Sequence, residues 1–411
     1  MRHALVAALA SLAAFATSVP AQSPPAVWAD AWGRSPLSTT VTTSSTTVQA
    51  TTPATFKNQT LRLIVFPTLG GSRVRVKLTN KFSKTPLAVG AAHVAVRQSG
   101  GTIVAGTDRA LTFGGASSVT IAAGAEVWSD PATLSITART DLAISLYVPG
   151  TFIPTTFHPT GLKTSYLSKA GNFSASATMP AAAWPNPATT TTVFFVSDVQ
   201  VLTPPDTMVL VALGDSITDG ATAATNQNAS WPDDLAKRFP GLADGTPVSV
   251  INMGIGSNRF CASDGAGPAG LHRLSDDVLS RPNVTHLILL EGINDISYEH
   301  VSAATLIACY ASAIAQAHAA GVEVFMSPLL PIKYSVKSTP ANEATREAVN
   351  AWIRATPASS GGPDALIDFE AAVWDPSDHL AIRSSLTTDH VHPNTQGYQA
   401  MANAIDLSLF K

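Results

Sequence analysis

The sequence predicts a protein of two parts, an all-β sandwich or jelly roll followed by a three-layer α/β/α domain. The chain has 411 residues, which is more than one typical hydrophobic core holds, so two domains are expected. Short alternating runs separated by turn residues fill the first half, a pattern typical of antiparallel sheets. Strand-like and helical runs alternate in the second half, which predicts a parallel sheet with helices on both faces.

The expected strands of the first half are short and regularly spaced. The run at 72–78, Ser-Arg-Val-Arg-Val-Lys-Leu, alternates with a period of two, as a strand with one buried face does. Further runs lie at 61–66, 93–96, 119–121, 142–148 and 192–196. Two stretches rich in Thr, Ser, Ala and Pro, at 39–52 and 181–192, are expected to form exposed loops or linkers.

The pattern changes after Pro204-Pro205, a pair that can continue neither a helix nor a central strand. We therefore expect a β-domain over 22–205 and an α/β domain over 206–411. The strands expected in the second domain lie at 208–213, 247–252, 286–290, 322–326 and 365–369. The helices expected there lie near 230–239, 268–280, 302–320, 341–355 and 395–409.

The first 21 residues have the pattern of an export signal. Met1-Arg2-His3 is a short basic region, an apolar stretch runs to about Thr17, and Val19-Pro20-Ala21 resembles a cleavage site. The apolar stretch is too short to span a bilayer. We expect cleavage after Ala21, and hence a secreted or periplasmic protein with no membrane span.

Charge and cysteine content exclude some classes of protein. The net charge of −3 becomes −4 when Arg2 leaves with the signal peptide. A mildly acidic chain without a basic run is not expected to bind nucleic acid. Cys261 and Cys309 are the two cysteines. In an oxidising compartment they could pair, or they could remain two buried thiols, and the sequence leaves both possibilities open.

Residues that can carry chemistry follow the expected strands of the second domain. Ser216 comes directly after the first strand, at the carboxyl edge where open α/β folds hold their active sites. A serine hydroxyl becomes a nucleophile when a neutral imidazole accepts its proton and a carboxylate orients that imidazole. Asp389 and His392, three residues apart before the last helix, provide both groups. Asn294 follows the third strand and could donate to an oxyanion.

Each of these residues also has a simpler interpretation. Ser216 could be the N-cap of a helix, and Asn294-Asp295 could form an ordinary turn. Asp389 and His392 could form an ion pair in a loop. Their joint arrival at one edge of the sheet favours the catalytic interpretation over the simpler ones.

Four segments together carry a family resemblance. They are Gly214–Ile217, Asn252–Arg259, Gly292–Asp295 and Asp389–Pro393. In order and spacing they resemble the four blocks of the SGNH, or GDSL-type, hydrolases. This resemblance covers 206–411 and implies a flavodoxin-like α/β/α fold.

The first half is also similar to a domain that precedes this module in some relatives. Trp28–Trp32, Gly70–Val76 and Ser145–Val148 resemble segments of the β-domain in a secreted, lysophospholipase-like esterase subgroup.

The resemblance implies a role for each residue of the site. Ser216 would be the nucleophile, His392 the general base and Asp389 its orienting partner. The oxyanion hole would contain the side-chain amide of Asn294, the backbone N–H of Ser216 and a backbone N–H of the second block. The family usually has glycine five residues after the Asn of that block, where this chain has Ser257. We assign the donor to Gly256. No cofactor or metal is required.

Other site types are disfavoured. Gly265–Gly270 fits a dinucleotide-binding pattern, but no strand precedes it. His390-Val391-His392 lacks the accompanying ligands of a metal site. The chain has no G-x-S-x-G sequence, so the nucleophile turn of the α/β-hydrolase fold is absent.

We therefore expect an exported serine ester hydrolase that cleaves short acyl esters through an acyl-enzyme. Acetyl esters of carbohydrates or other polyols, as small molecules or polysaccharides, are the favoured substrates. One alternative is a lipase or lysophospholipase, although the sequence has no long apolar lid segment. Another is a polymer-binding β-domain on a weakly active scaffold. Acyl length, alcohol and oligomeric state are left open.

Overall fold

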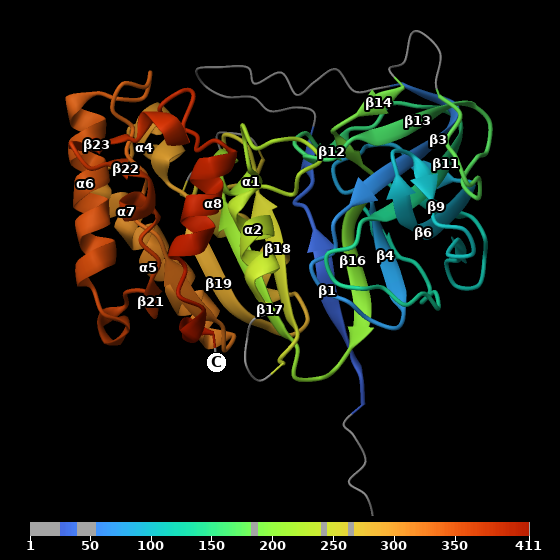
Figure 1. Cartoon of the computed structure of the whole chain (residues 1–411), viewed down its shortest axis with the longest axis horizontal. Helices are drawn as coiled ribbons and strands as arrows, with labels where there is room; N and C mark the ends of the chain where they lie inside the picture. The colour runs from blue at the N-terminus through green and yellow to red at the C-terminus, as the bar shows by residue number, and fades with distance from the viewer. Residues whose placement is uncertain (1–24, 39–54, 182–187, 240–244, 262–266, 411) are drawn as a thin grey trace, which may run out of the picture.

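The protein has a strand-rich part and an α/β part that lie side by side (Figure 1). The computed structural model describes residues 25–38, 55–181, 188–239, 245–261 and 267–410. The expected signal peptide and the Thr/Ser-rich stretch at 39–52 lie outside these residues. The first two residues of the segment Gly265–Gly270, Gly265 and Ala266, also lie outside them. Within the described residues, no helix is long and apolar enough to cross a membrane.

The strand-rich part is built from antiparallel sheets. One sheet has four strands in the order β1-β16-β4-β10. Its strands are β1 (Val27–Gly33), β16 (Val196–Thr203), β4 (Val74–Thr79) and β10 (Glu126–Trp128). In β4 the valines and leucine are buried and the intervening arginine and lysine are half-buried, which follows from the period-two alternation of the sequence.

A second, larger sheet has the order β14-β13-β3-β11-β6-β7, with β8 paired to β6. Its strands are β14 (Thr189–Thr190), β13 (Ser165–Ala170), β3 (Phe56–Val65), β11 (Leu142–Phe152), β6 (Ala91–Ser99), β7 (Thr102–Ile103) and β8 (Arg109–Leu111). Shorter pieces complete this part: β2 (Leu37–Ser38), β12 (Thr156–His158), β15 (Val193–Phe194), β5 (Leu87–Val89) and β9 (Val119–Ile121). Aromatic rings fill the core, with Phe56 edge-on to Phe194 at 5.5 Å between centroids.

The α/β part contains a five-stranded parallel sheet in the order β18-β17-β19-β20-β21. Its strands are β17 (Met208–Gly214), β18 (Val248–Gly254), β19 (Val284–Leu290), β20 (Glu323–Met326) and β21 (Ala365–Leu366). In chain order this is 2-1-3-4-5, the flavodoxin-like arrangement, whose ligand site lies where the strand order reverses. Here that point lies between β17 and β19. The predicted fold class is confirmed.

Helices cover the parallel sheet in two groups (Figure 1). The first group is α2 (Trp231–Arg238), α7 (Phe369–Val373) and α8 (Thr395–Ala404), and the second is α3 (Gly270–Leu274), α5 (Ala303–Ala319) and α6 (Pro340–Ala355). Trp231 packs on Phe369 in the first group, and Tyr310 stacks on Trp352 in the second. Side-chain oxygens cap the N-termini of four of these helices, from Ser230 at α2, Ser302 at α5, Thr339 at α6 and Asn394 at α8.

Short elements differ from the expectation. Helices α1 (Ser216–Asp219) and α4 (Ile293–Glu299) and the hairpin of β22 (Trp374–Asp375) and β23 (Asp378–Ile382) were not predicted. The helix expected over 268–280 is α3 followed by a π-helical turn, η2 (Ser275–Leu279). These pieces span too few residues for a hydrophobic period to show in the sequence.

The two parts meet along β1 and β18 through buried polar contacts. The Thr68 hydroxyl accepts from the Val250 N–H at 3.0 Å. Arg281 pairs with Asp198 at 2.6 Å and with Asp30 at 3.1 Å. Burial raises the pKa of the Asp198 carboxyl, but Arg281 and Lys77 outweigh it and bring the pKa to about 2. The sheets are antiparallel up to β16 and the main sheet from β17 onward is parallel, but these contacts join the two parts in one interface.

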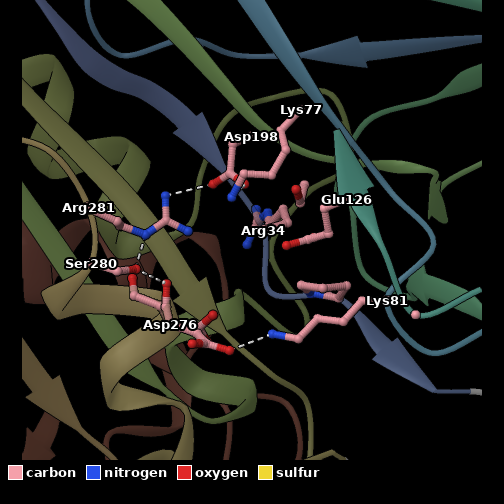
Figure 2. A pocket seen from close by; sticks show the side chains of 12 residues that line it. Arg34, Lys77, Lys81, Glu126, Asp198, Asp276, Ser280 and Arg281 are labelled. Carbon is pink, nitrogen blue, oxygen red and sulfur yellow. Dashed lines mark hydrogen bonds and ion pairs between the residues drawn. The ribbon is translucent and has the colours of Figure 1, made fainter. Parts of the chain in front are cut away.

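A polar cavity of about 310 Å³ opens along this interface. Figure 2 shows Arg281 directed at Asp198 on one side, and Lys81 of the β-part directed at Asp276 of the α/β part on the other. Lys77 also pairs with Asp198, at 2.9 Å. The cavity is thus lined by cations and carboxylates that already bind one another.

Candidate active site

The four side chains expected at the site come together at the carboxyl edge of the parallel sheet. Ser216 is the first residue of α1, directly after β17, and Asn294 lies in the first turn of α4, after β19. These are the two strands that flank the reversal of strand order. Asp389 and His392 lie in the loop before α8.

The loop before α8 is held against the segment that follows α1. The Thr222 hydroxyl donates to the Pro393 carbonyl at 2.8 Å, and the Ala224 N–H donates to the Thr395 hydroxyl at 3.0 Å. From α8, the Tyr398 hydroxyl donates to the Ala221 carbonyl at 2.7 Å. These contacts bring the two ends of the domain to one place.

Ser216, His392 and Asp389 form a row of hydrogen bonds. Ser216 Oγ lies 2.8 Å from His392 Nε2, and His392 Nδ1 lies 2.6 Å from Asp389 Oδ2. The other carboxylate oxygen, Asp389 Oδ1, accepts the N–H groups of His392 at 2.8 Å and Val391 at 3.0 Å. Because the carboxylate faces Nδ1, that nitrogen carries the proton and Nε2 presents its lone pair to the hydroxyl.

The row is partly open to solvent. The side chain of His392 is 21% exposed and that of Asp389 is 44% exposed. Burial raises the pKa of the Asp389 carboxyl, but its bonds from the His392 ring and the two N–H groups lower the pKa further, so the net shift is downward. The carboxylate is therefore ionised at neutral pH.

A strand–turn–helix junction presents Ser216. Asp215 caps α1 by accepting the Ile217 N–H at 2.9 Å. Gly214 precedes it, and a Cβ at that position would overlap the Leu290 carbonyl and Thr218. Gly220, with a φ of 99°, ends the helix after one turn. The sequence Gly-Asp-Ser-x-x-x-Gly therefore follows from the geometry of the turn.

Three N–H donors that could face an oxyanion lie around this turn. The Ser216 N–H is the first of α1, where no preceding turn supplies an acceptor. The Asn294 amide donates to the Asn258 carbonyl at 2.9 Å, and its nitrogen lies 3.4 Å from Asp215 Oδ2. This buried amide thus sits beside the residue that precedes Ser216.

The third donor belongs to the turn after β18. In the described part of the chain, the N–H groups of Gly256 and Ser257 have no hydrogen-bond acceptor. Ser257 has a φ of 62°, a conformation that favours glycine. This explains why a glycine is usual at that position in the resembling family. Gly256 lies one residue earlier in the same turn.

Buried contacts that the sequence did not reveal fix the segment after this turn. Asp295, interpreted above as a possible turn residue, accepts the N–H groups of Phe260 at 2.7 Å and Cys261 at 2.8 Å. Burial raises the pKa of Asp295 to about 6, against the effect of these N–H groups. Cys261 and Cys309 are joined in a disulfide, which answers the question that the sequence left open.

Lys337 is a further neighbour that no motif indicated. Its Nζ lies 2.5 Å from Asn294 Oδ1 and 4.3 Å from the centre of the Tyr298 ring. A single lysine in a loop of Tyr, Ser and Val gives no signal in a sequence.

The β-part also reaches the helix that carries Ser216. Asp219, the last residue of α1, accepts from His158 Nε2 at 3.0 Å and from Arg34 at 3.3 Å. His158 is fixed in turn by its Nδ1, 2.9 Å from the Ser35 carbonyl. Arg34 and His158 are both buried, and neither lies in a segment with a recognisable sequence pattern.

A metal centre is not evident in the described residues, since these contain no group of three or more His, Cys, Asp or Glu side chains that could hold an ion.

The flavodoxin-like fold, with this row of side chains at the reversal of strand order, is that of a GDSL-type hydrolase domain. Residues 212–400 match the GDSL-like Lipase/Acylhydrolase family. The second part of the chain belongs to this family, and the chain is a carboxylic ester hydrolase of the SGNH/GDSL type.

Solved structures similar to this chain match the same half of it. A carbohydrate acetylesterase family member from Sinorhizobium meliloti is 14% identical and covers 49% of this chain and 97% of its own, with a TM-score of 0.38. The lipase/acylhydrolase from Enterococcus faecalis is 20% identical and covers 48% and 92%, with a TM-score of 0.36. An aryl esterase from M. smegmatis is 14% identical and covers 48% and 95%, with a TM-score of 0.39. No curated protein matches the chain.

Proposed function

We propose that the protein is an exported serine esterase that removes short acyl groups, acetyl above all, from carbohydrates or other polyols. Ser216 is the nucleophile, His392 the general base and Asp389 the group that orients the base. The observation that carries this proposal is the row of hydrogen bonds from Ser216 Oγ through His392 to Asp389, at 2.8 and 2.6 Å.

Each step of the reaction has a group available for it. Ser216 Oγ attacks the ester carbonyl carbon while His392 Nε2 takes the hydroxyl proton. The carbonyl oxygen becomes an oxyanion, which the N–H groups of Ser216, the Gly256-Ser257 turn and Asn294 stabilise. His392 then returns the proton to the departing alcohol, and the C–O bond to the alcohol breaks. Water, deprotonated by His392, cleaves the acyl-enzyme by the same steps.

The surroundings of the nucleophile support a short acyl group. Polar or charged side chains lie beside it, from Asp215, Asn294 and Lys337. These groups offer no apolar surface on which a long acyl chain could pack. Export is supported by the N-terminal sequence pattern alone.

One observation favours the second candidate, a lipase or lysophospholipase. The loop that carries Lys337 exposes 65% of Tyr334 and 97% of Val336. The Tyr334 ring lies edge-on to His390, two residues before His392, at 5.8 Å between centroids. Exposed apolar side chains beside an active site can bind an apolar substrate group.

A series of chromogenic esters from C2 to C12 tests the proposal. We expect the highest kcat/KM at C2 to C4, and a loss of about 10³-fold or more in the Ser216→Ala variant. A Ser377→Ala variant is the matched control, because that serine is exposed in the turn between β22 and β23. Equal rates for wild type and Ser216→Ala would refute the catalytic assignment.

An optimum at C8 to C12 would favour the lipase candidate. Release of acetate from acetylated xylan or pectin by wild type, and not by Ser216→Ala, would identify the acetyl polysaccharide as a substrate.

A further inference from the structure

The side chain of Lys337 meets the oxyanion-hole amide from the side opposite its donor group. Lys337 Nζ donates to Asn294 Oδ1 at 2.5 Å, while Asn294 Nδ2 donates to the Asn258 carbonyl at 2.9 Å. The amide is therefore held at both ends, by a cation at its oxygen and by a carbonyl at its nitrogen.

The Lys337 ammonium can only donate hydrogen bonds, so it can face only the oxygen of the amide. This fixes which end of Asn294 lies toward Asp215 and the nucleophile turn. A cation at Oδ1 also draws electron density from the amide, which makes the Nδ2 hydrogens better donors. Both effects favour an oxyanion that forms on the Nδ2 side.

The loop that carries Lys337 is itself fixed. The Lys337 N–H donates to the Ser335 hydroxyl at 3.2 Å, and its carbonyl accepts from the Asn342 side chain of α6 at 2.8 Å. The ammonium also lies over the Tyr298 ring of α4, at 4.3 Å from its centre, a contact that stabilises a cation.

We propose that Lys337 is a positioning residue for the oxyanion hole: its ammonium orients and polarises the Asn294 amide, and so raises the rate of ester attack. This inference rests on the proposed esterase function and adds a residue that no family block contains. In this proposal Lys337 acts through Asn294, and no bond to Lys337 forms or breaks.

The charge on Lys337 depends on pH in the working range. Burial lowers its pKa to about 8, and the charge of Arg259 acts in the same direction, while Asp215 and Asp389 oppose it. The charged form is present below that pH and is lost as the pH rises through it. A neutral amine has a lone pair that can accept from Nδ2 and no charge to polarise the amide, so the Asn258 carbonyl alone then holds its orientation.

A double-mutant cycle with Asn294 tests the proposal. Alone, Lys337→Met is expected to lower kcat about 10-fold with KM within about twofold, a part of the loss that follows removal of a whole oxyanion donor. In an Asn294→Ala background the same change is expected to alter kcat less than about twofold, because Lys337 acts through that amide. Equal losses in both backgrounds, or no loss in either, would overturn the proposal.

The dependence of kcat on pH provides a second test, because a purely structural role of Lys337 would leave that dependence unchanged. Wild type is expected to lose kcat as the pH rises through about 8, and Lys337→Met is expected to lack this decline. Lys337→Arg, which stays charged, should move the decline to higher pH. A decline that stays at the same pH in both variants would contradict the role of Lys337, even if Lys337→Met proved too unstable for the cycle.

The outcome separates this inference from the proposed function. If wild type and Ser216→Ala hydrolyse esters equally, the esterase assignment fails. If only wild type is active and Lys337→Met matches it in kcat and pH profile, the esterase assignment stands and the role of Lys337 alone fails.

Discussion

At the scale of single residues, the proposed chemistry depends on how tightly Asp389 is held. Its carboxylate accepts three hydrogen bonds, two from backbone N–H groups and one from the His392 ring. These bonds keep it ionised and place the ring with Nε2 toward Ser216. Although the site is partly open to water, the short loop Asp389–His392 thus fixes the orientation of the His392 ring.

An Asp389→Asn variant tests whether the carboxylate orients the His392 ring. The amide cannot hold the His392 tautomer that presents a lone pair to Ser216, so we expect kcat to fall roughly 10³- to 10⁴-fold with the fold intact. Steady-state kinetics and thermal unfolding would check this. Asp375→Asn, at an exposed carboxylate that accepts from Ser377, is the control. A loss of less than tenfold in Asp389→Asn would contradict the role of Asp389.

Ser257 shows a departure from the family pattern that has a physical cost. Its φ of 62° costs a non-glycine residue about 1 kcal/mol. We expect Ser257→Gly to keep its activity, since the backbone N–H is unchanged, and to raise the free energy of unfolding by up to about 1 kcal/mol. Urea unfolding and ester hydrolysis would measure both. Loss of activity in Ser257→Gly would mean that the serine side chain takes part.

At the scale of elements, the strands and long helices could be predicted and the short pieces could not. The pattern of apolar residues in the sequence predicted all five strands of the parallel sheet and the helix α5. It missed α1 and α4, whose four and seven residues carry Ser216 and Asn294. The predicted side chains nevertheless come together, because the motif positions relative to the strands do not depend on those helices.

The disulfide ties the segment after β18 to α5, and its effect belongs to this scale. Cys261 and Cys309 are 48 residues apart, so their bond restricts the unfolded chain. We expect the Cys261→Ala, Cys309→Ala double variant to lose about 2–4 kcal/mol of unfolding free energy. Urea titration with and without reductant would measure this, and wild type should approach the variant only when reduced. Equal stability of variant and oxidised wild type would contradict the prediction.

At the scale of the whole molecule, the β-part contacts the α/β part near Ser216, the proposed nucleophile. Arg34 and His158 bind Asp219 at the end of α1, and Arg281 binds two carboxylates of the β-part. Sequence reasoning treated the β-domain as an accessory, because contacts between residues far apart in the chain leave no local pattern. The same limitation hid Lys337.

This coupling predicts that the two parts work as a unit. Arg34→Met and His158→Phe each leave Asp219 with fewer partners in a buried place, so we expect each to destabilise the protein by about 1–3 kcal/mol and to lower kcat. A Lys169→Met variant, with an exposed lysine of the β-part, is the control. Thermal unfolding and ester hydrolysis would test this. Unchanged kcat in both variants would show that the β-part does not support α1.

The most direct test of the central claim is covalent trapping of the nucleophile. A fluorophosphonate reacts with a serine only when a neighbouring base activates it. Peptide mass spectrometry of the treated full chain should find the label on Ser216, and the label should disappear in His392→Ala. A label on another residue, or equal labelling of Ser216 without the imidazole, would contradict the account.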